Sequence, residues 1–338
     1  MSKMEKITLK PGLEIGPTAP PFIIAEVGSN WANLQDCMDS ISQAKLAGAS
    51  AVKFQAFNNL DLYGVITQST PDSLCEHPFA LPLNWIHQLK EKADAVGIEF
   101  MCTAFSPRVA KIVDPFVRVH KVASSDVSHV KLLEELNKMN KPVILSIGAT
   151  NHSDIESALS LLASVPVVLM YCVSAYPARE VDLELIKDIR ERYGHFVGFS
   201  DHTIDVRVIP TQAIKWGAVV LEKHFKLRDF PGSGDSPFAL TREEFKLMID
   251  AIRGKRMLQC YTREESEMIL KHNRRLIVTR DVAVGETFQD GVNFGAYRSK
   301  KSDDKGLSGF LLNRVEGRQA AVALSAGDSI GPFDILTV

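Results

Sequence analysis

Short apolar runs alternate with longer amphipathic stretches along most of the chain. Several runs are almost continuously apolar, as expected for parallel strands that are covered on both faces. Eight runs fit this description: 22–26, 51–55, 99–103, 118–122, 143–146, 167–172, 196–199 and 218–221. Helical stretches follow them near 34–48, 82–97, 109–113, 129–139, from 153, 182–193, 206–216 and from 241. The pattern predicts an α/β fold, a (β/α)8 TIM barrel. An open doubly wound sheet is the alternative, but no G-x-G-x-x-G motif follows the first run.

Local signals predict where several elements begin or turn. Pro11-Gly12 predicts the turn of a short N-terminal hairpin within residues 4–20. Two stretches, Ser153 to Glu156 and Thr241 to Glu244, fit the capping-box pattern, in which a hydroxyl and a carboxylate satisfy free backbone N–H groups. We therefore expect a helix to begin at each of them.

The rhythm of the chain changes past about residue 270. There, 278–288 and 321–330 each combine strand character with a glycine turn, which predicts two similar β/turn units. We expect a TIM-barrel domain with its hairpin over 1–265, a charged helical linker over 266–277 and a small β-rich domain over 278–338.

Composition narrows the class of protein. Hydrophobic residues make up 45% of the chain, which is enough for a sizeable core, and 39 basic residues against 41 acidic ones give a net charge of −2. No global field therefore favours nucleic acid or a membrane surface. The five cysteines form no CxxC pattern, and neither a signal peptide nor an 18-residue apolar run is present. We expect a cytoplasmic protein with free thiols.

Polar residues follow every one of the eight predicted strands. In a TIM barrel the catalytic groups lie at these carboxyl ends, where the loops converge. The residues concerned are Glu26, Lys53, Gln55, Thr103, Lys121, Ser124, Ser146, Tyr176, Ser200, Asp201, His202, Glu222 and His224. A site is the better interpretation, because solubility alone does not require functional groups at all eight exits.

The chemical types of these residues fall into two groups. Two lysines and several hydroxyls suit a phosphate, namely Lys53, Lys121, Thr103, Ser124, Ser146 and Ser200. His202 and His224 can bind a divalent transition metal, with oxygens of Glu26, Asp201, Glu222 and Asp235 as further candidates. Each histidine taken alone could instead be structural, and each lysine could be a solvated surface residue. Together they predict a phosphorylated small molecule beside an open metal site.

The motifs at these strand ends resemble those of the sialic acid synthase family, which includes the N-acetylneuraminate, pseudaminic and legionaminic acid synthases. The matching stretches are collinear: Ile23–Gly28, Val52–Gln55, His120–Ser124, Ile144–Gly148, Ser174–Pro177, Gly198–Thr203 and Leu221–Phe225. The tail resembles the small antifreeze-like (SAF) domain that follows the barrel in that family. The resemblance thus covers essentially the whole chain.

The resemblance implies a C–C bond-forming transferase that condenses phosphoenolpyruvate with an open-chain N-acetylated hexosamine. The acceptor would be N-acetylmannosamine or a di-N-acetyl deoxyhexose, and the products a nine-carbon 2-keto acid sugar and phosphate. It implies a phosphoenolpyruvate site formed by Lys53, Thr103, Lys121, Ser124, Ser146, Ser174 and Ser200. It implies Glu26, Asp235 and Tyr176 as catalytic residues, and His202 and His224 as ligands of Mn²⁺, with Mg²⁺ or Co²⁺ as alternatives. Gln55 would contact the sugar. Arg298 would contact the sugar in the active site of the partner subunit, which implies a domain-swapped homodimer.

The chain departs from the family pattern at several positions. An Asn-His-Asn stretch reads Ser29 to Asn33 here, which places Trp31 at the histidine and leaves its packing on substrate or in the core open. The loop after Arg298 lacks the usual Pro-Gly-Asn-Gly sequence. The segments 174–178 and 234–240 look slightly more like the pseudaminic acid synthases.

Three other functions remain open from the sequence. One is condensation of phosphoenolpyruvate with a phosphorylated aldose, which would need a second cationic cluster. A metal-dependent TIM-barrel hydrolase would need a closer set of carboxylates around the metal and would not need two strand-end lysines. A non-catalytic binding protein would leave the polar barrel mouth unexplained. Whether Asp201 touches the metal or orients His202 also stays open.

Overall fold

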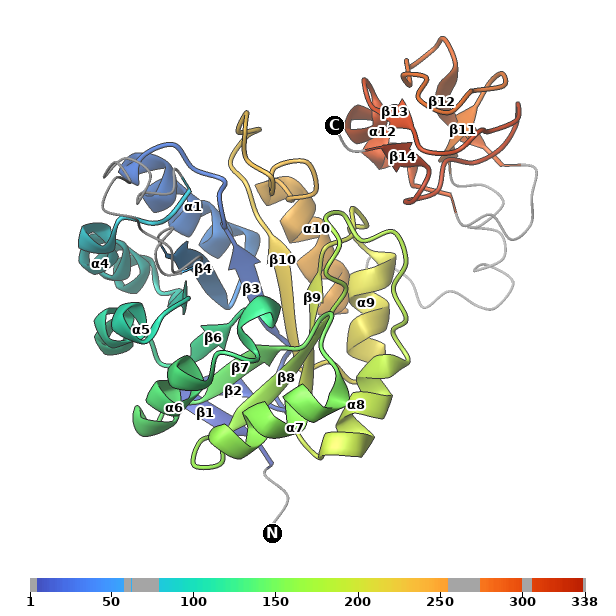
Figure 1. Ribbon diagram of the computed structural model, residues 1–338. Coiled ribbons are helices and arrows are strands. Elements are labelled where there is room, and N and C mark those ends of the chain that lie inside the picture. The colour runs from blue at the N-terminus through green and yellow to red at the C-terminus, as the bar shows by residue number, and fades with distance from the viewer. Residues whose placement is uncertain (1–4, 58–61, 63–78, 255–273, 300–305, 337–338) are drawn as a thin grey trace, which may run out of the picture. The chain divides into compact units, whose positions relative to one another are not determined.

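The computed structural model describes residues 5–57, 62, 79–254, 274–299 and 306–336 (Figure 1). The chain divides into two compact units, one made of residues 1–202 with 206–255 and the other of 203–205 with 256–338. Within the described part of the chain, no helix has both the length and the apolar character needed to cross a membrane.

Eight parallel strands of the first unit close into a barrel, in the order β10-β3-β4-β5-β6-β7-β8-β9 (Figure 1). The strands are β3 (Phe22–Glu26), β4 (Ala51–Ala56), β5 (Glu99–Ala104), β6 (His120–Val122), β7 (Val143–Ser146), β8 (Val167–Cys172), β9 (Phe196–Asp201) and β10 (Val220–His224). The predicted TIM barrel is confirmed, and the doubly wound alternative is excluded because β10 pairs with β3.

Helices cover the outside of the barrel between successive strands (Figure 1). They are α1 (Leu34–Ala47), α4 (Ile86–Val96), α5 (Pro107–Val113), α6 (Val130–Lys138), α7 (His152–Leu161), α8 (Leu185–Tyr193), α9 (Val208–Lys215) and α10 (Arg242–Ile252), with short 3₁₀ turns η1 (Leu83–Trp85), η2 (Asp114–Phe116) and η3 (Ser124–Asp126).

The two predicted capping boxes have different outcomes. The box of Thr241 and Glu244 at the start of α10 is confirmed, with both reciprocal hydrogen bonds present. The box at Ser153 is wrong, because α7 begins at His152 and its N-cap lies two residues before Ser153. Asn151 is its N-cap, and the Asn151 side chain accepts a hydrogen bond from the backbone N–H of Asp154. An asparagine caps a helix as well as serine does, so it competed for the same N–H groups.

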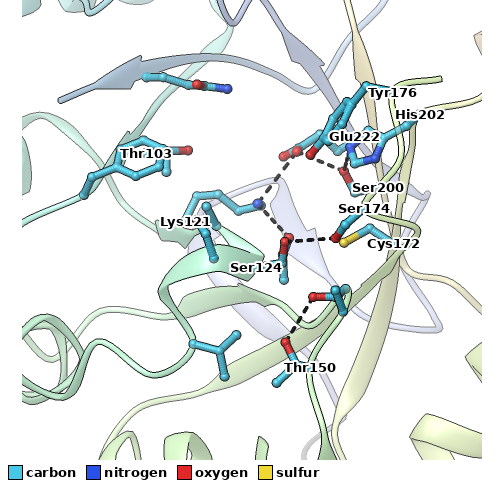
Figure 2. Close-up of a pocket in the computed structure, with 18 of the residues that line it drawn as sticks. Thr103, Lys121, Ser124, Thr150, Cys172, Ser174, Tyr176, Ser200, His202 and Glu222 are labelled. Atoms are coloured by element: carbon cyan, nitrogen blue, oxygen red, sulfur yellow. Dashed lines mark hydrogen bonds and ion pairs between the residues drawn. The ribbon is translucent and has the colours of Figure 1, made fainter. Parts of the chain in front are cut away.

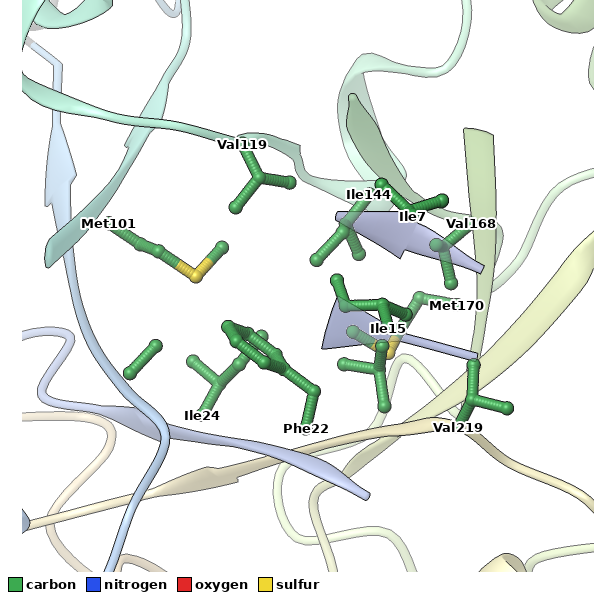
Figure 3. Close-up of a cluster of buried hydrophobic side chains, with 12 residues drawn as sticks. Ile7, Ile15, Phe22, Ile24, Met101, Val119, Ile144, Val168, Met170 and Val219 are labelled. Atoms are coloured by element: carbon green, nitrogen blue, oxygen red, sulfur yellow. The ribbon is translucent and has the colours of Figure 1, made fainter. Parts of the chain in front are cut away.

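The amino end of the barrel is filled by apolar side chains (Figure 3). The cluster takes one or two residues from most strands, and the predicted hairpin of β1 (Ile7–Lys10) and β2 (Leu13–Ile15) adds Ile7 and Ile15 to it. Its other residues lie on the strands or directly before them: Phe22, Ile24, Ala51, Met101, Val119, Ile144, Val168, Met170, Val219 and Val220. Successive side chains of a strand alternate between faces, so the residues two positions further along point into the same barrel. Those positions carry the polar residues predicted above.

The second unit contains the turns of the two predicted β/turn units. Val282 and Leu324 exchange backbone hydrogen bonds of 2.8 and 2.9 Å, and each is followed by a turn in which a glycine adopts positive φ, 81° at Gly285 and 92° at Gly327. Only glycine adopts such angles without strain. The amides of these glycines donate to Ala320 and Val278 respectively, each at 2.8 Å. The paired glycine turns of the predicted repeat are present, but its strands are not, because 279–288 and 321–330 contain only isolated bridges such as that of Val282 with Leu324.

The other elements of the second unit surround a separate apolar core. They are β11 (Arg274–Val278), β12 (Phe294–Arg298), η4 (Gly309–Leu311), α12 (Leu312–Val315), β13 (Gln319–Ala320) and β14 (Ile335–Leu336). Strand β11 takes in residues 274–277, which the sequence had placed in the linker, and the rest of that predicted linker lies outside the described residues. The assignment of this unit to the SAF class stays a prediction.

Candidate active site

A pocket of about 560 Å³ lies at the carboxyl end of the barrel (Figure 2). Its lining includes most of the predicted site residues: Lys53, Gln55, Thr103, Lys121, Ser124, Ser146, Ser174, Tyr176, Ser200, His202 and His224. Glu26 and Asp235 lie directly behind this lining, in contact with Lys53 and His224 respectively. The barrel therefore brings the predicted residues of the first unit together.

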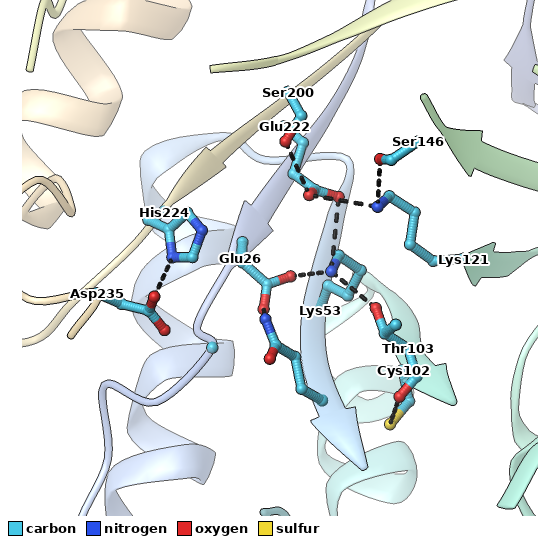
Figure 4. A network of polar contacts seen from close by, with 12 residues as sticks. Glu26, Lys53, Cys102, Thr103, Lys121, Ser146, Ser200, Glu222, His224 and Asp235 are labelled. Atoms are coloured by element: carbon cyan, nitrogen blue, oxygen red, sulfur yellow. Dashed lines mark hydrogen bonds and ion pairs between the residues drawn. The ribbon is translucent and has the colours of Figure 1, made fainter. Parts of the chain in front are cut away.

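Lys53 is the centre of a buried network of charges (Figure 4). Its ammonium group pairs with the carboxylate of Glu26, donates to Thr103 Oγ1 at 2.9 Å and lies 3.6 Å from Glu222 Oε2. The Lys53 side chain is only 2% exposed. Burial by itself would lower the pKa of this ammonium group, but the charges of Glu222 and Glu26 outweigh it and raise the pKa. Lys53 is therefore a fixed positive charge at the pocket wall.

Lys121 is the second buried cation of the pocket. It donates to Ser146 Oγ at 2.8 Å and lies 3.7 Å from Glu222 Oε1. Burial lowers its pKa, and the opposing charge of Glu222 compensates only in part. Glu222 thus stands between the two lysines. Burial would raise its pKa, but the charges of Lys121 and Lys53 hold the pKa of Glu222 at about 2, so it stays ionised.

Glu26 differs from Glu222 although both carboxyl groups are buried beside Lys53. Burial raises the pKa of Glu26, and the negative charge of Glu222 adds to the effect of burial against the opposing charge of Lys53. Gln55 donates a hydrogen bond of 3.1 Å to Glu26 Oε1. Of the two carboxyl groups, Glu26 is therefore the one whose protonated form is the more favoured, which suits it to exchange a proton.

Hydroxyl groups complete the wall on the side of Lys121. Ser124 and Ser174 lie with their hydroxyl oxygens 3.4 Å apart, and Ser200 donates to Glu222 Oε1 at 3.2 Å (Figure 2). Ser200 Oγ also lies 3.3 Å from His202 Nε2, so this residue joins the charged network to the imidazoles.

The two imidazoles predicted as metal ligands line the same pocket. The ring centroids of His202 and His224 are 5.8 Å apart, and Tyr176 packs on His202 at 4.3 Å. His202 Nδ1 donates to the backbone oxygen of Val173 at 2.8 Å, which leaves the lone pair on Nε2. Burial, and to a lesser extent His224, lowers the pKa of His202 to about 4, so the ring is neutral at physiological pH. Tyr176 is 56% exposed, but the part of its side chain that lies in the pocket loses hydration, which raises its pKa to about 12, so near neutral pH it carries a hydroxyl.

The donor set fits a divalent cation with open coordination positions. Neutral imidazole is a common metal ligand, and both rings line the pocket, with Nδ1 of His202 hydrogen-bonded to Val173 and Nδ1 of His224 facing Asp235. Within the described ranges, no group of three or more His, Cys, Asp or Glu side chains is arranged to hold a metal. The two histidines would therefore share the ion with water or substrate oxygens, as an open catalytic site requires.

Asp201 lies on the other face of its strand. It pairs with Lys223 at 2.8 Å, and both side chains are 0% exposed. The two residues are in register on β9 and β10, and each immediately precedes one of the histidines. Because side chains alternate, the pair points away from the barrel interior, toward the helices. Asp201 is therefore not a metal ligand, and it braces the strand that carries His202.

The sequence left open whether Trp31 packs on the substrate, and it gave Arg298 a role only by resemblance. Trp31 is 8% exposed, packs edge-on against Trp85 at 5.6 Å and donates from its indole nitrogen to the backbone oxygen of Gly28 at 3.0 Å. It is a core residue rather than a platform for substrate. Arg298 ends strand β12 in the second unit and is exposed there, so its role toward the sugar stays a prediction.

The sequence did not predict the position of Glu222 between the two lysines, nor the loop after β7 as part of the pocket. Glu222 was one metal-ligand candidate among four, although it lies two positions before His224 on the same face of β10 and joins both lysines. The loop after β7 also lines the pocket through Gly148, Ala149 and Thr150. Strand alternation could have revealed Glu222, whereas no pattern in the sequence marks the loop.

Comparison with known proteins identifies the family of the chain. The model of the NeuB family matches residues 40–262, which is more than half of the chain. The pseudaminic acid synthase of Helicobacter pylori is 29% identical over 341 residues, covering 94% of this chain and 98% of that protein. The N,N'-diacetyllegionaminic acid synthase of Legionella pneumophila is 28% identical, covering 93% and 94%.

A solved structure gives the same result. The N-acetylneuraminic acid (sialic acid) synthetase of Leptospira borgpetersenii, crystallised with citrate, superposes with a TM-score of 0.67 at 28% identity, covering 78% of this chain and 95% of that one. Family model, relatives and structure all agree with the motifs at the strand ends. The chain belongs to the NeuB family, the family of the sialic acid synthases, and it is an enzyme.

Proposed function

We propose that this enzyme condenses phosphoenolpyruvate with an open-chain N-acetylated hexosamine to give a nine-carbon 2-keto acid sugar and phosphate. One observation carries the proposal: two buried lysines and a set of hydroxyls share a pocket with two imidazoles, of which His202 is held neutral. The first group suits a phosphate and the second an ion that binds a carbonyl oxygen. The family membership supports the same reaction.

The phosphoenolpyruvate would lie against the wall formed by Lys53, Lys121 and their hydroxyl neighbours. Lys121 already donates to Ser146, and Lys53 to Thr103, so both ammonium groups are oriented before substrate arrives. Hydrogen bonds from charged donors are stronger than neutral ones, and the buried setting strengthens them further. Glu222 keeps the two lysines from repelling each other in the empty pocket.

His202 and His224 would hold the divalent cation, Mn²⁺ by resemblance with Mg²⁺ or Co²⁺ as alternatives. When bound, such an ion polarises the acceptor's aldehyde oxygen as a Lewis acid.

The remaining steps use this chain's own groups. The π electrons of the C2=C3 bond of phosphoenolpyruvate form the bond from C3 to the aldehyde carbon, whose oxygen takes up a proton and becomes a hydroxyl of the product. A water adds at C2 and gives up one proton, which balances the proton taken up by the sugar oxygen. The C2–O bond to phosphate then breaks as the C2 hydroxyl gives its proton to the departing phosphate and becomes the keto group. Glu26, with its raised pKa, would orient this water and take up its proton. Burial would raise the pKa of Asp235, but the electrostatic interaction with His224 and the hydrogen bonds from Ser29 outweigh it and lower the pKa. Asp235 would therefore orient the acceptor as a carboxylate rather than protonate it.

The pocket favours an acceptor without a phosphate. Of the described residues that line it, Lys53 and Lys121 are the only lysines or arginines, and both lie on the phosphoenolpyruvate wall. A phosphorylated aldose would need a second cationic cluster. A metal-dependent hydrolase has no use for two buried lysines, so both alternatives are less well supported. The relatives named for pseudaminic and legionaminic acid favour a di-N-acetylated deoxyhexose as acceptor.

We also propose that Arg298 reaches the sugar in the partner subunit of a domain-swapped homodimer. The chain offers a direct test by complementation. At a phosphoenolpyruvate concentration below the raised KM of Lys53→Ala, a mixture of an Arg298→Ala chain with a Lys53→Ala chain should be more active than either variant alone, whereas no gain would contradict the exchange.

The experiment that tests the reaction measures phosphate release from phosphoenolpyruvate with a panel of hexosamines, with and without Mn²⁺. Release that depends on both an N-acetylated hexosamine and the metal supports the synthase. Release without any sugar would indicate a hydrolase, and release only with a sugar phosphate would identify the alternative condensation.

A further inference from the structure

The loop after β3 is joined to the loop after β10 by hydrogen bonds that centre on Asp235. Ser29 donates to Asp235 Oδ2 twice, from its backbone N–H at 2.8 Å and from its hydroxyl at 2.7 Å. Ser233 Oγ lies 2.7 Å from Ser29 Oγ and accepts the backbone N–H of Asp235 at 3.2 Å. These loops lie about two hundred residues apart in the sequence, so the fold alone brings them together.

Gly28 allows the two loops to approach so closely. It adopts a φ of 54°, and a β-carbon at this position would lie 2.3 Å from Asp235 Oδ2 and 3.4 Å from Glu26 Oε1. Any side chain there would displace the carboxylate of Asp235. The backbone of Gly28 therefore passes between two carboxyl groups of the site, and it delivers the next residue, Ser29, to Asp235.

Both hydrogen bonds from Ser29 go to one carboxylate oxygen. The other oxygen, Asp235 Oδ1, faces His224 Nδ1 at 3.6 Å (Figure 4). Nδ1 of His224 is buried and has no hydrogen-bond partner. The arrangement thus fixes one end of the carboxylate and directs the other toward an imidazole that lines the pocket.

We propose that Ser29 is a positioning residue that acts through Asp235 on His224. Groups that hold a metal-ligating histidine from behind set its ring orientation and its affinity for the ion. By fixing Oδ2, Ser29 keeps Oδ1 beside His224 and so sets the metal affinity of the site. This inference rests on the proposed metal role of His224, and it concerns a residue within the stretch where the chain departs from the family pattern.

A purely structural role for Ser29 is less well supported by the contacts. Asn30 already ties the first loop down, because its amide donates to the backbone oxygen of Phe225 at 3.1 Å and its Oδ1 lies 2.9 Å from Ser233 Oγ. The loops would therefore remain joined without the Ser29 hydroxyl. What that hydroxyl adds is a contact to a carboxylate of the site.

The test compares Ser29→Ala, Ser29→Thr and Ser50→Ala in the full chain. Ser50 is a matched control, because its hydroxyl accepts a hydrogen bond from the backbone of Ile23 at the amino end of the same strand β3. Mn²⁺ affinity, measured by titration calorimetry without substrates, should fall about tenfold in Ser29→Ala, the lower end of the usual range for such supporting contacts. It should recover in Ser29→Thr and stay unchanged in Ser50→Ala.

A double-mutant cycle decides whether Ser29 acts through Asp235. In an Asp235→Asn background, Ser29→Ala should cause little further loss of Mn²⁺ affinity, because residues that act as a unit are not additive. Additive losses would overturn the proposal, as would a lower melting temperature of Ser29→Ala with unchanged Mn²⁺ affinity. The result stands apart from the proposed reaction, since it needs no turnover. If the wild-type enzyme binds Mn²⁺ but releases no phosphate from phosphoenolpyruvate, only the reaction is refuted.

Discussion

The same barrel strands carry two different layers of inward side chains. On β4, Ala51 belongs to the apolar cluster and Lys53 to the charged network. On β7 the corresponding residues are Ile144 and Ser146. We call the apolar cluster at the amino end of the barrel the lower layer and the charged network at the carboxyl end the upper layer. The lower layer stabilises the fold by removing apolar surface from water, which contributes about 25 cal/mol per Å². The upper layer buries charges, which costs desolvation free energy that ion pairs only partly return. Side chains two positions apart on one strand therefore serve different purposes: the first stabilises the fold and the second belongs to the site.

The largest effect is expected from breaking the upper layer at Lys53. Lys53→Ala leaves Glu26 and Glu222 buried without their shared cation, which should lower the free energy of unfolding by about 3–5 kcal/mol. The KM for phosphoenolpyruvate should also rise about tenfold or more, from loss of a contact worth about 1.5–3 kcal/mol. Urea unfolding and steady-state kinetics measure the two effects.

A surface lysine provides the control for this variant. Lys246 pairs with Asp250 at 2.6 Å on α10, with 53% of the lysine side chain exposed. Lys246→Ala should cost less than about 1 kcal/mol and leave the kinetics unchanged. A folded Lys53→Ala enzyme with wild-type KM for phosphoenolpyruvate would refute the assignment of Lys53 to the phosphate wall.

The next effect separates stability from activity in the lower layer. Ile144→Ala removes apolar atoms from the apolar cluster at the amino end of the barrel and should lower the free energy of unfolding by about 2–5 kcal/mol. Its kcat and its KM for phosphoenolpyruvate should stay close to wild type, because the cavity opens away from the pocket. A large rise in KM would show that the two layers are mechanically coupled.

The complementary variant lies two residues further along the same strand. Ser146→Ala removes the hydroxyl that accepts a hydrogen bond from Lys121 at 2.8 Å. Hydrogen bonds to charged groups contribute about 1.5–3 kcal/mol, so the KM for phosphoenolpyruvate should rise about tenfold. The loss of stability should be smaller than in Ile144→Ala. If Ser146→Ala proved the less stable of the two, the division into layers would be wrong.

The two layers also explain what could be predicted from the sequence. The apolar runs marked the strands, and their polar ends marked the pocket, because a barrel brings all eight exits together. His202 and Lys121 were found in this way. Alternation of side chains along β9 also places Asp201 on the outer face. The prediction considered only residue types, so it did not decide whether Asp201 contacts the metal.

Other contacts could not be predicted, because they join residues that no periodicity relates. The hydrogen bonds of Ser29 to Asp235 span 206 positions. The N-cap of α7 at Asn151 was not predicted, because Asn151 and Ser153 carry equally good capping groups and only the backbone path decides between them. Strand β11 was taken in part for linker because its first residues, Arg274 and Arg275, are charged.

The last and smallest effect distinguishes two carboxyl groups within the upper layer. Glu26 has a raised pKa in the folded protein, so it contributes stability below its unfolded pKa of 4.5 and loses that contribution as the pH rises through its folded pKa. Glu222, with a pKa of about 2, contributes fully above pH 4.5 and loses its contribution only as the pH falls toward 2.

Urea unfolding of wild type, Glu26→Gln and Glu222→Gln between pH 4.5 and 8 separates the contributions of the two carboxyl groups. The stability difference between wild type and Glu26→Gln should shift against the wild type as the pH rises, whereas the difference from Glu222→Gln should shift less, by only the part of the Glu26 pKa shift that the charge of Glu222 causes. Two parallel profiles would mean that burial does not set Glu26 apart, and Glu26 would lose its role as the proton acceptor.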